Sequence, residues 1–127
     1  MGDRKQVLVI DDDRALLDAL TVGLKSKTVD VISAVDPEAG LRQALRHRPS
    51  LIVLDILMPN LDGIELLKKL RAHDSAYCKT VPVIILTNLS DEKAVKQAGK
   101  LGCHDYVIKS NVSLNTVAEL VKSKLSI

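Results

Sequence analysis

The chain of 127 residues is 46% hydrophobic and 27% charged, and its formal net charge at pH 7 is +2. These values are ordinary for a globular protein, and we predict one domain over residues 1–127. The net charge is too small to create an overall field that would attract nucleic acid or a membrane surface. Phe and Trp are absent and only two Tyr are present, so a surface that stacks nucleic-acid bases is not expected. No apolar run approaches the roughly 20 residues of a membrane span. The cysteines, Cys78 and Cys103, form no CxxC pair, which favours reduced thiols and a cytoplasmic location.

The hydrophobic pattern alternates between strand and helix along the chain. Apolar and β-branched runs predict five strands, at 6–10, 29–34, 51–54, 81–86 and 105–108. After each strand, apolar residues recur at helical spacing, and a polar residue suited to cap the helix precedes them. The predicted caps are Asp13, Asp36, Asp62, Ser90 or Asp91, and Ser113. Residues 59–63 and 73–79 are predicted to be loops, and Gly102 is predicted to follow the end of the fourth helix.

Strands that alternate with helices indicate an α/β fold in which a parallel sheet is covered on both faces. Right-handed crossovers and five strands favour a flavodoxin-like (βα)5 doubly wound fold with the strand order 2-1-3-4-5. In that order the topology reverses between the first and third strands. Ligands bind at such a switch point, outside the carboxyl ends of the strands.

Chemically active side chains stand at four of the predicted carboxyl ends. Asp11 and Asp12 follow the first strand and Asp55 follows the third, while Thr87 and Lys109 follow the fourth and fifth. Two carboxylates about 4 Å apart repel by about 4 kcal/mol at an effective dielectric constant of about 20, so the acids must protonate or bind a cation. Ligands that are all oxygen favour Mg²⁺. Beside this metal, Asp55 is suited to attack a phosphoryl group, with Lys109 and Thr87 as donors to its oxygens.

Four motifs, in order along the chain, are similar to those of the receiver domain of two-component response regulators. They are Val-Ile-Asp11-Asp12, Leu-Asp55-Ile-Leu-Met-Pro59 with Asp62-Gly63, Leu86-Thr87, and Asp105-Tyr106-Val-Ile-Lys109. The similarity extends over nearly the whole chain. It implies a phosphorylation-activated signalling switch, which catalyses only its own phosphorylation and dephosphorylation and is not an enzyme for a separate substrate.

The resemblance assigns roles to individual residues. Asp55 is the expected phosphoacceptor, and its partner is a sensor histidine kinase, a phosphotransfer protein or a small phosphodonor. The expected Mg²⁺ ligands are Asp12 directly, Asp11 largely through water, Asp55, and the backbone carbonyl of Leu57.

The resemblance also implies how the signal leaves the site. Thr87 is expected to move toward the phosphoryl group, which Lys109 also contacts, and Tyr106 is expected to change its packing together with Thr87. This coupling would alter the face formed by the fourth helix, the fifth strand and the fifth helix. That face would then control a downstream output protein or domain, or form a homodimer, with no direct contact to nucleic acid or membrane.

Two features depart from the family pattern. The family usually has Pro after the lysine, commonly with a cis peptide bond, whereas this chain has Ser110 after Lys109. Because a cis bond before a non-proline residue costs about 2.5–4 kcal/mol, we expect a trans peptide bond and a differently shaped loop. In addition, the positions two residues beyond Asp55 and Thr87 are both leucine, Leu57 and Leu89, and we expect these apolar groups to slow self-dephosphorylation.

Other readings of the same residues remain. Asp11 to Asp13 contain Asp-x-Asp, which with Thr87 and Lys109 resembles a haloacid-dehalogenase-like phosphatase, although that reading leaves Asp55 unexplained. The three acids are also a candidate cap for the first helix, and Tyr106 a candidate core aromatic. Finally, the chain is compatible with a receiver-like module that is never phosphorylated and acts by binding alone.

Overall fold

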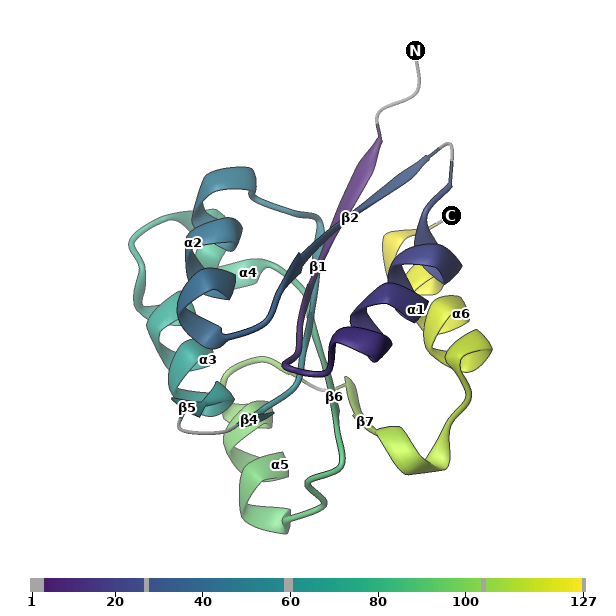
Figure 1. The fold of residues 1–127 in the computed structure, drawn as a ribbon. Helices are drawn as coiled ribbons and strands as arrows, with labels where there is room; N and C mark the ends of the chain where they lie inside the picture. The colour runs from purple at the N-terminus through teal and green to yellow at the C-terminus, as the bar shows by residue number, and fades with distance from the viewer. Residues whose placement is uncertain (1–3, 27, 59–60, 104, 127) are drawn as a thin grey trace.

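The computed structural model describes residues 4–26, 28–58, 61–103 and 105–126 and contains one central parallel sheet (Figure 1). Its strands lie in the order β2-β1-β3-β6-β7, and every neighbouring pair is parallel. In chain order they are β1 (Lys5–Ile10), β2 (Val29–Ala34), β3 (Leu51–Leu54), β6 (Val83–Thr87) and β7 (Asp105–Ile108). Counted along the chain, these five strands have the predicted order 2-1-3-4-5, so the flavodoxin-like fold is confirmed.

Helices cover both faces of the sheet, as Figure 1 shows. One layer consists of α1 (Arg14–Leu24) and α6 (Leu114–Leu125), which pack against each other. The other consists of α2 (Pro37–His47), α3 (Gly63–Ala72), α5 (Glu92–Lys100) and the short α4 (Ala76–Thr80). This arrangement leaves the carboxyl ends of the strands uncovered by helices.

Two apolar cores form because successive side chains of a strand point to opposite faces of the sheet. In β1, Leu8 and Ile10 join the core under α2 and α3, whereas Val7 and Val9 join the core under α1 and α6. All four residues of β3 are buried, as the continuous apolar run predicts for a strand covered on both sides. The central strands are therefore held by burial in both layers.

The predicted helix starts agree with the structure. At each start, the side chain of the capping residue accepts a hydrogen bond from a backbone N–H in the first turn, which satisfies one of the unpaired donors there. The caps are Asp13, Asp36, Asp62, Asp91 rather than Ser90, and Ser113. Gly102 follows the C-cap of α5 with a φ of +85°, a conformation that glycine adopts without steric cost.

The loop predicted at residues 73–79 is wrong, because α4 occupies Ala76–Thr80. Ser75 caps this helix by accepting a hydrogen bond from the N–H of Cys78, whose side chain is buried. The pattern was missed since one helical turn is too short to show a period.

Two further boundaries differ from the prediction. The fourth strand of the sheet begins at Val83 rather than at residue 81. The loop predicted at residues 59–63 is also only partly right. Leu61–Asp62 within this range form β5, which pairs antiparallel with β4 (Leu57–Met58), and α3 already begins at Gly63. Pro59, Asn60 and His104 lie outside the described residues.

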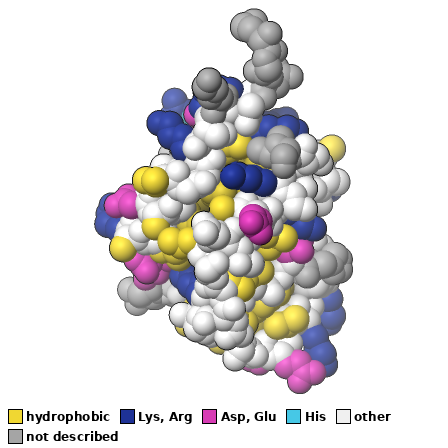
Figure 2. Space-filling model, turned by 90° about the vertical axis from the view of Figure 1, so that its right-hand side faces the viewer, with side chains coloured by type: hydrophobic (Ala, Val, Ile, Leu, Met, Phe, Trp, Pro, Cys, Tyr) yellow, Lys and Arg dark blue, Asp and Glu magenta, His cyan; other side chains and the backbone are white. Residues whose placement is uncertain are grey.

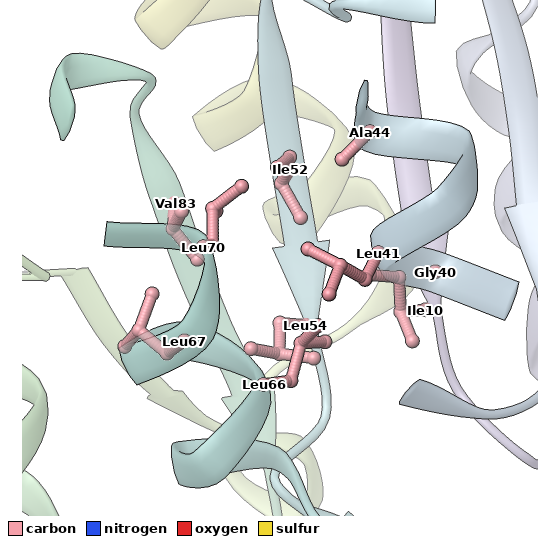
Figure 3. Close-up of a pocket in the computed structure, with 10 residues that line it drawn as sticks. All are labelled: Ile10, Gly40, Leu41, Ala44, Ile52, Leu54, Leu66, Leu67, Leu70 and Val83. Carbon is pink, nitrogen blue, oxygen red and sulfur yellow. The ribbon is translucent and has the colours of Figure 1, made fainter. Parts of the chain in front are cut away.

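A cavity of about 10 Å³ lies between the sheet and helices α2 and α3 (Figure 3). Its lining is entirely apolar: Ile10, Gly40, Leu41, Ala44, Ile52, Leu54, Leu66, Leu67, Leu70 and Val83. A buried water needs two to four polar partners, which this lining does not provide. The cavity is therefore a packing gap of the core.

The side of the molecule that carries α1 and α6 is shown in Figure 2. On this side, Lys and Arg are interspersed with Asp and Glu instead of forming one patch of a single sign. Two apolar side chains of these helices are well exposed, Val22 at 80% and Leu114 at 46%. None of the helices in the described ranges is both long and apolar enough to cross a membrane.

Candidate functional site

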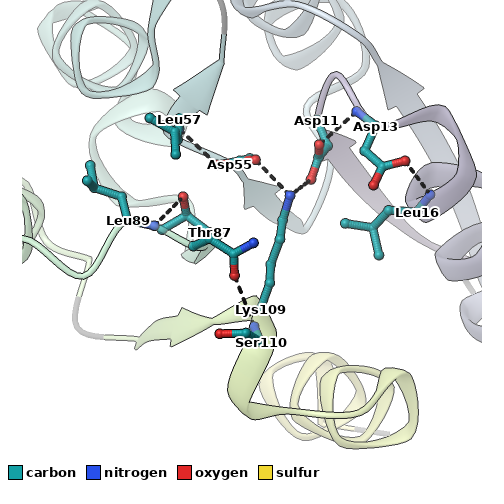
Figure 4. A network of polar contacts seen from close by, with 10 residues as sticks. Asp11, Asp13, Leu16, Asp55, Leu57, Thr87, Leu89, Lys109 and Ser110 are labelled. Atoms are coloured by element: carbon teal, nitrogen blue, oxygen red, sulfur yellow. Dashed lines mark hydrogen bonds and ion pairs between the residues drawn. The ribbon is translucent and has the colours of Figure 1, made fainter.

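Four of the predicted site residues meet at the carboxyl ends of the strands (Figure 4): Asp11, Asp55, Thr87 and Lys109. Asp11 directly follows β1 and Asp55 directly follows β3, two strands that pair in register up to Ile10 and Leu54. Because β2 extends the sheet on one side of β1 and β6 on the other side of β3, these two acids stand at the topological switch point. The sheet order alone thus brings together carboxylates that lie 44 positions apart in the sequence.

Lys109 links the two acids. Its Nζ lies 2.6 Å from Asp11 Oδ2 and 2.7 Å from Asp55 Oδ2. Both aspartates are buried, with 2% and 4% of their surface exposed, so each would be costly to hold as a lone charge. One ammonium shared by two carboxylates stabilises all three charges in the same place.

Backbone N–H groups hold the other oxygens of these acids. The N–H of Asp13 donates to Asp11 Oδ1 at 2.9 Å, and the N–H of Leu57 donates to Asp55 Oδ1 at 2.8 Å. In both cases the donor lies two residues after the acid, the arrangement of an Asx turn. Each carboxylate is therefore fixed by its own loop on one side and by Lys109 on the other.

Burial and charge shift the pKa values of these groups. Burial raises the pKa of Asp11, and the nearby Asp55 acts in the same direction, while Lys109 and the N–H of Asp13 oppose the shift without cancelling it. Burial alone would lower the pKa of Lys109, but its bonds to Asp11 and Asp55 outweigh this effect and raise that pKa. Lys109 consequently stays positively charged at neutral pH.

A third acid, Asp12, is exposed at the mouth of the site. Asp11, Asp12 and Asp55 each offer a carboxylate oxygen, and these atoms all lie within 4.8 Å of one another. No Cys or His within the described ranges joins this group, and carboxylate oxygens alone are the donor set that Mg²⁺ prefers. Leu57, the predicted source of a carbonyl ligand, lies two residues after Asp55 with its side chain 55% exposed. The residues present fit this metal.

Thr87 and Tyr106 both contact Leu89, in the loop between β6 and α5. Thr87 is fully buried, and its Oγ1 accepts a hydrogen bond from the N–H of Leu89 at 3.3 Å. Tyr106 is half-buried, and its hydroxyl donates to the carbonyl of Leu89 at 2.5 Å. Both side chains are predicted from the sequence, whereas the backbone of Leu89 that joins them is not. No sequence pattern marks such a backbone contact.

The loop after Lys109 has the expected trans peptide bond at Ser110. Residues Lys109–Asn111 form a single 3₁₀ turn, η1. The N–H of Ser110 donates to Asn88 Oδ1 at 3.0 Å, and this contact is likewise not predicted from the sequence. Asn88 therefore connects the loop after β6 with the loop after β7.

A doubly wound sheet with three carboxylates, a threonine and a lysine at its switch point defines a receiver-type signalling domain. The response regulator receiver domain family matches residues 7–122, and the chain belongs to this family. Its members are signalling proteins of two-component systems rather than classical enzymes, and they bind Mg²⁺ at an acidic pocket. The haloacid-dehalogenase-like alternative is set aside by this finding.

Relatives and solved structures agree with the family. The chain is 40% identical over 106 residues to the alkaline phosphatase synthesis transcriptional regulatory protein PhoP of Bacillus subtilis, which covers 83% of this chain and 42% of that protein. It is 39% identical over 115 residues to the transcriptional regulatory protein PrrA of Mycobacterium tuberculosis, covering 91% and 48%. The chain thus spans less than half the length of each of these relatives.

The solved receiver domains cover the chain almost completely. The response regulator receiver domain protein (CheY-like) of Methanospirillum hungatei superposes with a TM-score of 0.85 at 26% identity, over 98% of this chain and 95% of that one. The receiver domain of the Francisella response regulator 1452 gives 0.81 at 30% identity, over 97% and 98%. These similarities support a phosphorylation-controlled switch for this domain.

Proposed function

We propose that the domain takes a phosphoryl group onto Asp55 from a sensor histidine kinase, a phosphotransfer protein or a small phosphodonor, with Mg²⁺ at the site. The observation that carries the proposal is the placement of one lysine ammonium between two buried aspartates beside a third. A structural ion pair would need only one carboxylate. A phosphoryl-transfer site needs both excess negative ligands for a cation and a fixed positive charge.

The chemistry requires few parts. An oxygen of Asp55 attacks phosphorus, the new bond is an acyl phosphate, and the bond to the donor breaks with its electron pair leaving on the donor atom. The loop N–H of Leu57 and the ammonium of Lys109 hold the carboxylate in place for this attack. Positioning of this kind is the main contribution that a protein makes to phosphoryl transfer.

The charge that develops on the phosphoryl oxygens also needs stabilisation. When bound, Mg²⁺ would be held by Asp11, Asp12, Asp55 and the carbonyl of Leu57, and it would supply charge neutralisation. Lys109 provides a second positive charge from the protein. Thr87 provides a hydroxyl whose proton has no recorded acceptor among the described residues, so that proton is available to a phosphoryl oxygen.

We further propose that Thr87 and Tyr106 convey the change to the face formed by α5, β7 and α6. Their shared contact with Leu89 supports this, because any shift of Thr87 that moves Leu89 also disturbs the hydroxyl contact of Tyr106. A new local charge would in this way shift the population of two conformations of the face. The partner would be a downstream output protein or domain. No comparison supports a homodimer through this face.

The direct test is incubation with Mg²⁺ and acetyl phosphate, followed by intact mass measurement. We expect the chain to gain one phosphoryl group, Asp55→Asn to gain none, and the gain to disappear in EDTA. Asp13→Asn is a matched control, because Asn caps helices as well as Asp does. The Asp13 side chain caps α1, and the N–H that Asp13 donates to Asp11 belongs to the backbone, which the substitution keeps. A folded wild-type chain that gains no phosphoryl group would refute the proposal and favour a module that acts by binding alone.

A further inference from the structure

Asn88 connects two loops that both carry site residues. It directly follows Thr87 at the end of β6, and its Oδ1 accepts a hydrogen bond at 3.0 Å from the N–H of Ser110, the residue after Lys109. The contact joins residues 22 positions apart, so it is part of the tertiary structure and not a local turn.

The contact begins where the strand pairing ends. Thr87 and Ile108 form the last registered pair of β6 and β7. Beyond this pair, the segment after β6 turns toward α5, and the segment after β7 enters the 3₁₀ turn that starts at Lys109. The side-chain oxygen of Asn88 takes the place of the backbone carbonyl that a continuing ladder would offer. The connection between the strands is thereby extended past Lys109.

Lys109 needs such support from its backbone. Its ammonium is held by oxygens of Asp11 and Asp55, and these are the carboxylates that the proposed reaction engages. When Asp55 reacts, its contact with Lys109 must rearrange so that the ammonium can reach the phosphoryl oxygens. The remaining restraint comes from the loop, in which Ser110 lacks the ring by which proline fixes its own φ.

We infer that Asn88 is a positioning residue that sets Lys109 over Asp55 through the N–H of Ser110. Ser110 supplies a donor that proline would not have, and Asn88 supplies the acceptor for it. The pair restrains the turn in place of a proline ring and ties the Lys109 loop to the Thr87 loop. This inference rests on the proposed function, since the position of Lys109 matters only if Asp55 reacts.

Three variants test the inference. Asn88→Leu keeps the size of the side chain and removes the acceptor, whereas Asn88→Asp restores an acceptor oxygen. Asn111→Leu makes the same change at an exposed residue of the same 3₁₀ turn, whose side chain makes no hydrogen bond to the described part of the chain. Phosphorylation by acetyl phosphate is measured over a range of donor concentrations at saturating Mg²⁺. High ionic strength screens the charge that Asp introduces.

We expect Asn88→Leu to lower the maximal rate constant about two- to fivefold, a modest loss because water competes for an exposed hydrogen bond. The half-saturating donor concentration, the Mg²⁺ affinity and the urea midpoint should stay unchanged, since Asn88 holds neither donor nor metal. Asn88→Asp should recover the rate, and Asn111→Leu should equal the wild type. In NMR spectra, hydrogen exchange of the Ser110 amide should accelerate and the Lys109 ammonium signal should shift in Asn88→Leu alone.

The outcomes separate the two proposals. A wild type that is phosphorylated while Asn88→Leu reacts at the same rate overturns the inference and leaves the proposed function intact. A slower Asn88→Leu with unchanged Ser110 and Lys109 signals also overturns it, because Asn88 would then act by another route. A folded wild type without any phosphoryl gain removes the proposed function, and the inference falls with it.

Discussion

Gly63 provides a sharp test of how tightly the Asp55 loop is built. A Cβ added to Gly63 would lie 2.5 Å from the Cα of Ile56 and 2.9 Å from the carbonyl oxygen of Asp55. Both neighbours are backbone atoms, so no side-chain rotation can relieve the contact. The N–H of Gly63 donates to the carbonyl of Ile56 at 3.2 Å, and the N–H of Asp55 donates to Ile10 at 2.9 Å. Movement apart would stretch or break these bonds.

The expected size follows from two opposing effects. Alanine gains up to about 1 kcal/mol over glycine inside a helix, and less in the first turn. Overpacking costs about 1–3 kcal/mol, and here the upper part of that range applies because the backbone must shift by close to 1 Å. Gly63→Ala should therefore lower the free energy of unfolding by about 2 kcal/mol. With a urea m-value of about 1–3 kcal/mol/M, the urea midpoint should fall by about 1 M.

Urea unfolding followed by far-UV circular dichroism measures this change, since the chain has no Trp to report it. Gly23→Ala in α1 and Gly99→Ala in α5 are matched controls, because an added Cβ meets no atom within 4 Å at either position. Both should raise stability by about 0.5 kcal/mol. If Gly63→Ala instead raised the urea midpoint as the controls do, the reasoning about a rigid Asp55 loop would be refuted.

Three more predictions concern the site and the opposite end of the sheet. The phosphoryl group of Asp55 should be lost severalfold faster in Leu57→Asn or Leu89→Asn, because an amide can hydrogen-bond the attacking water. An unchanged half-life of the phosphorylated chain would count against this. Mg²⁺ at ten times its Kd should stabilise the fold by about 1.4 kcal/mol, and EDTA should abolish the effect in thermal unfolding. Tyr77→Phe should cost about 1 kcal/mol at pH 7 by removing the 2.6 Å bond from its hydroxyl to the carbonyl of Pro49. Burial raises the pKa of Tyr77. The wild type therefore keeps the stabilisation from this hydrogen bond below about pH 10 and loses it as the pH rises further. The urea midpoints of the wild type and of Tyr77→Phe should accordingly converge at high pH.

The layout of the fold follows from features that lie close together in the sequence. The continuous run at β3 predicts a strand buried on both faces, and the cap residues predict where helices begin. The strand order follows from the handedness of crossovers. Once that order is accepted, Asp11 and Asp55 must stand side by side, so the centre of the site is predictable from local patterns and topology together.

What escaped prediction has no local pattern. The helix α4 consists of little more than one turn, and the pair β4 and β5 has two residues in each strand, too few for any period to show. The contacts of Asn88 with Ser110 and of Tyr106 with Leu89 join a side chain to a backbone group of a distant segment. Such bonds depend on how loops turn after the strands end, which composition and hydrophobic spacing do not determine.

The helix α5 rests on the remainder of the fold through very little apolar surface. Its buried residues are only Ala94 and Ala98, whereas α3 buries Ile64, Leu66, Leu67 and Leu70 as well as its first glycine. Burial of one carbon group contributes about 0.8 kcal/mol, so the two alanine methyl groups of α5 contribute a free energy of only a few times the thermal energy. The helix with this small buried apolar surface begins five residues after Thr87, and it lies beside a sheet whose central strand is buried on both faces. On the proposed function, a small force that arises at Asp55 is taken up as displacement of α5, while the sheet that aligns the reacting groups keeps its shape.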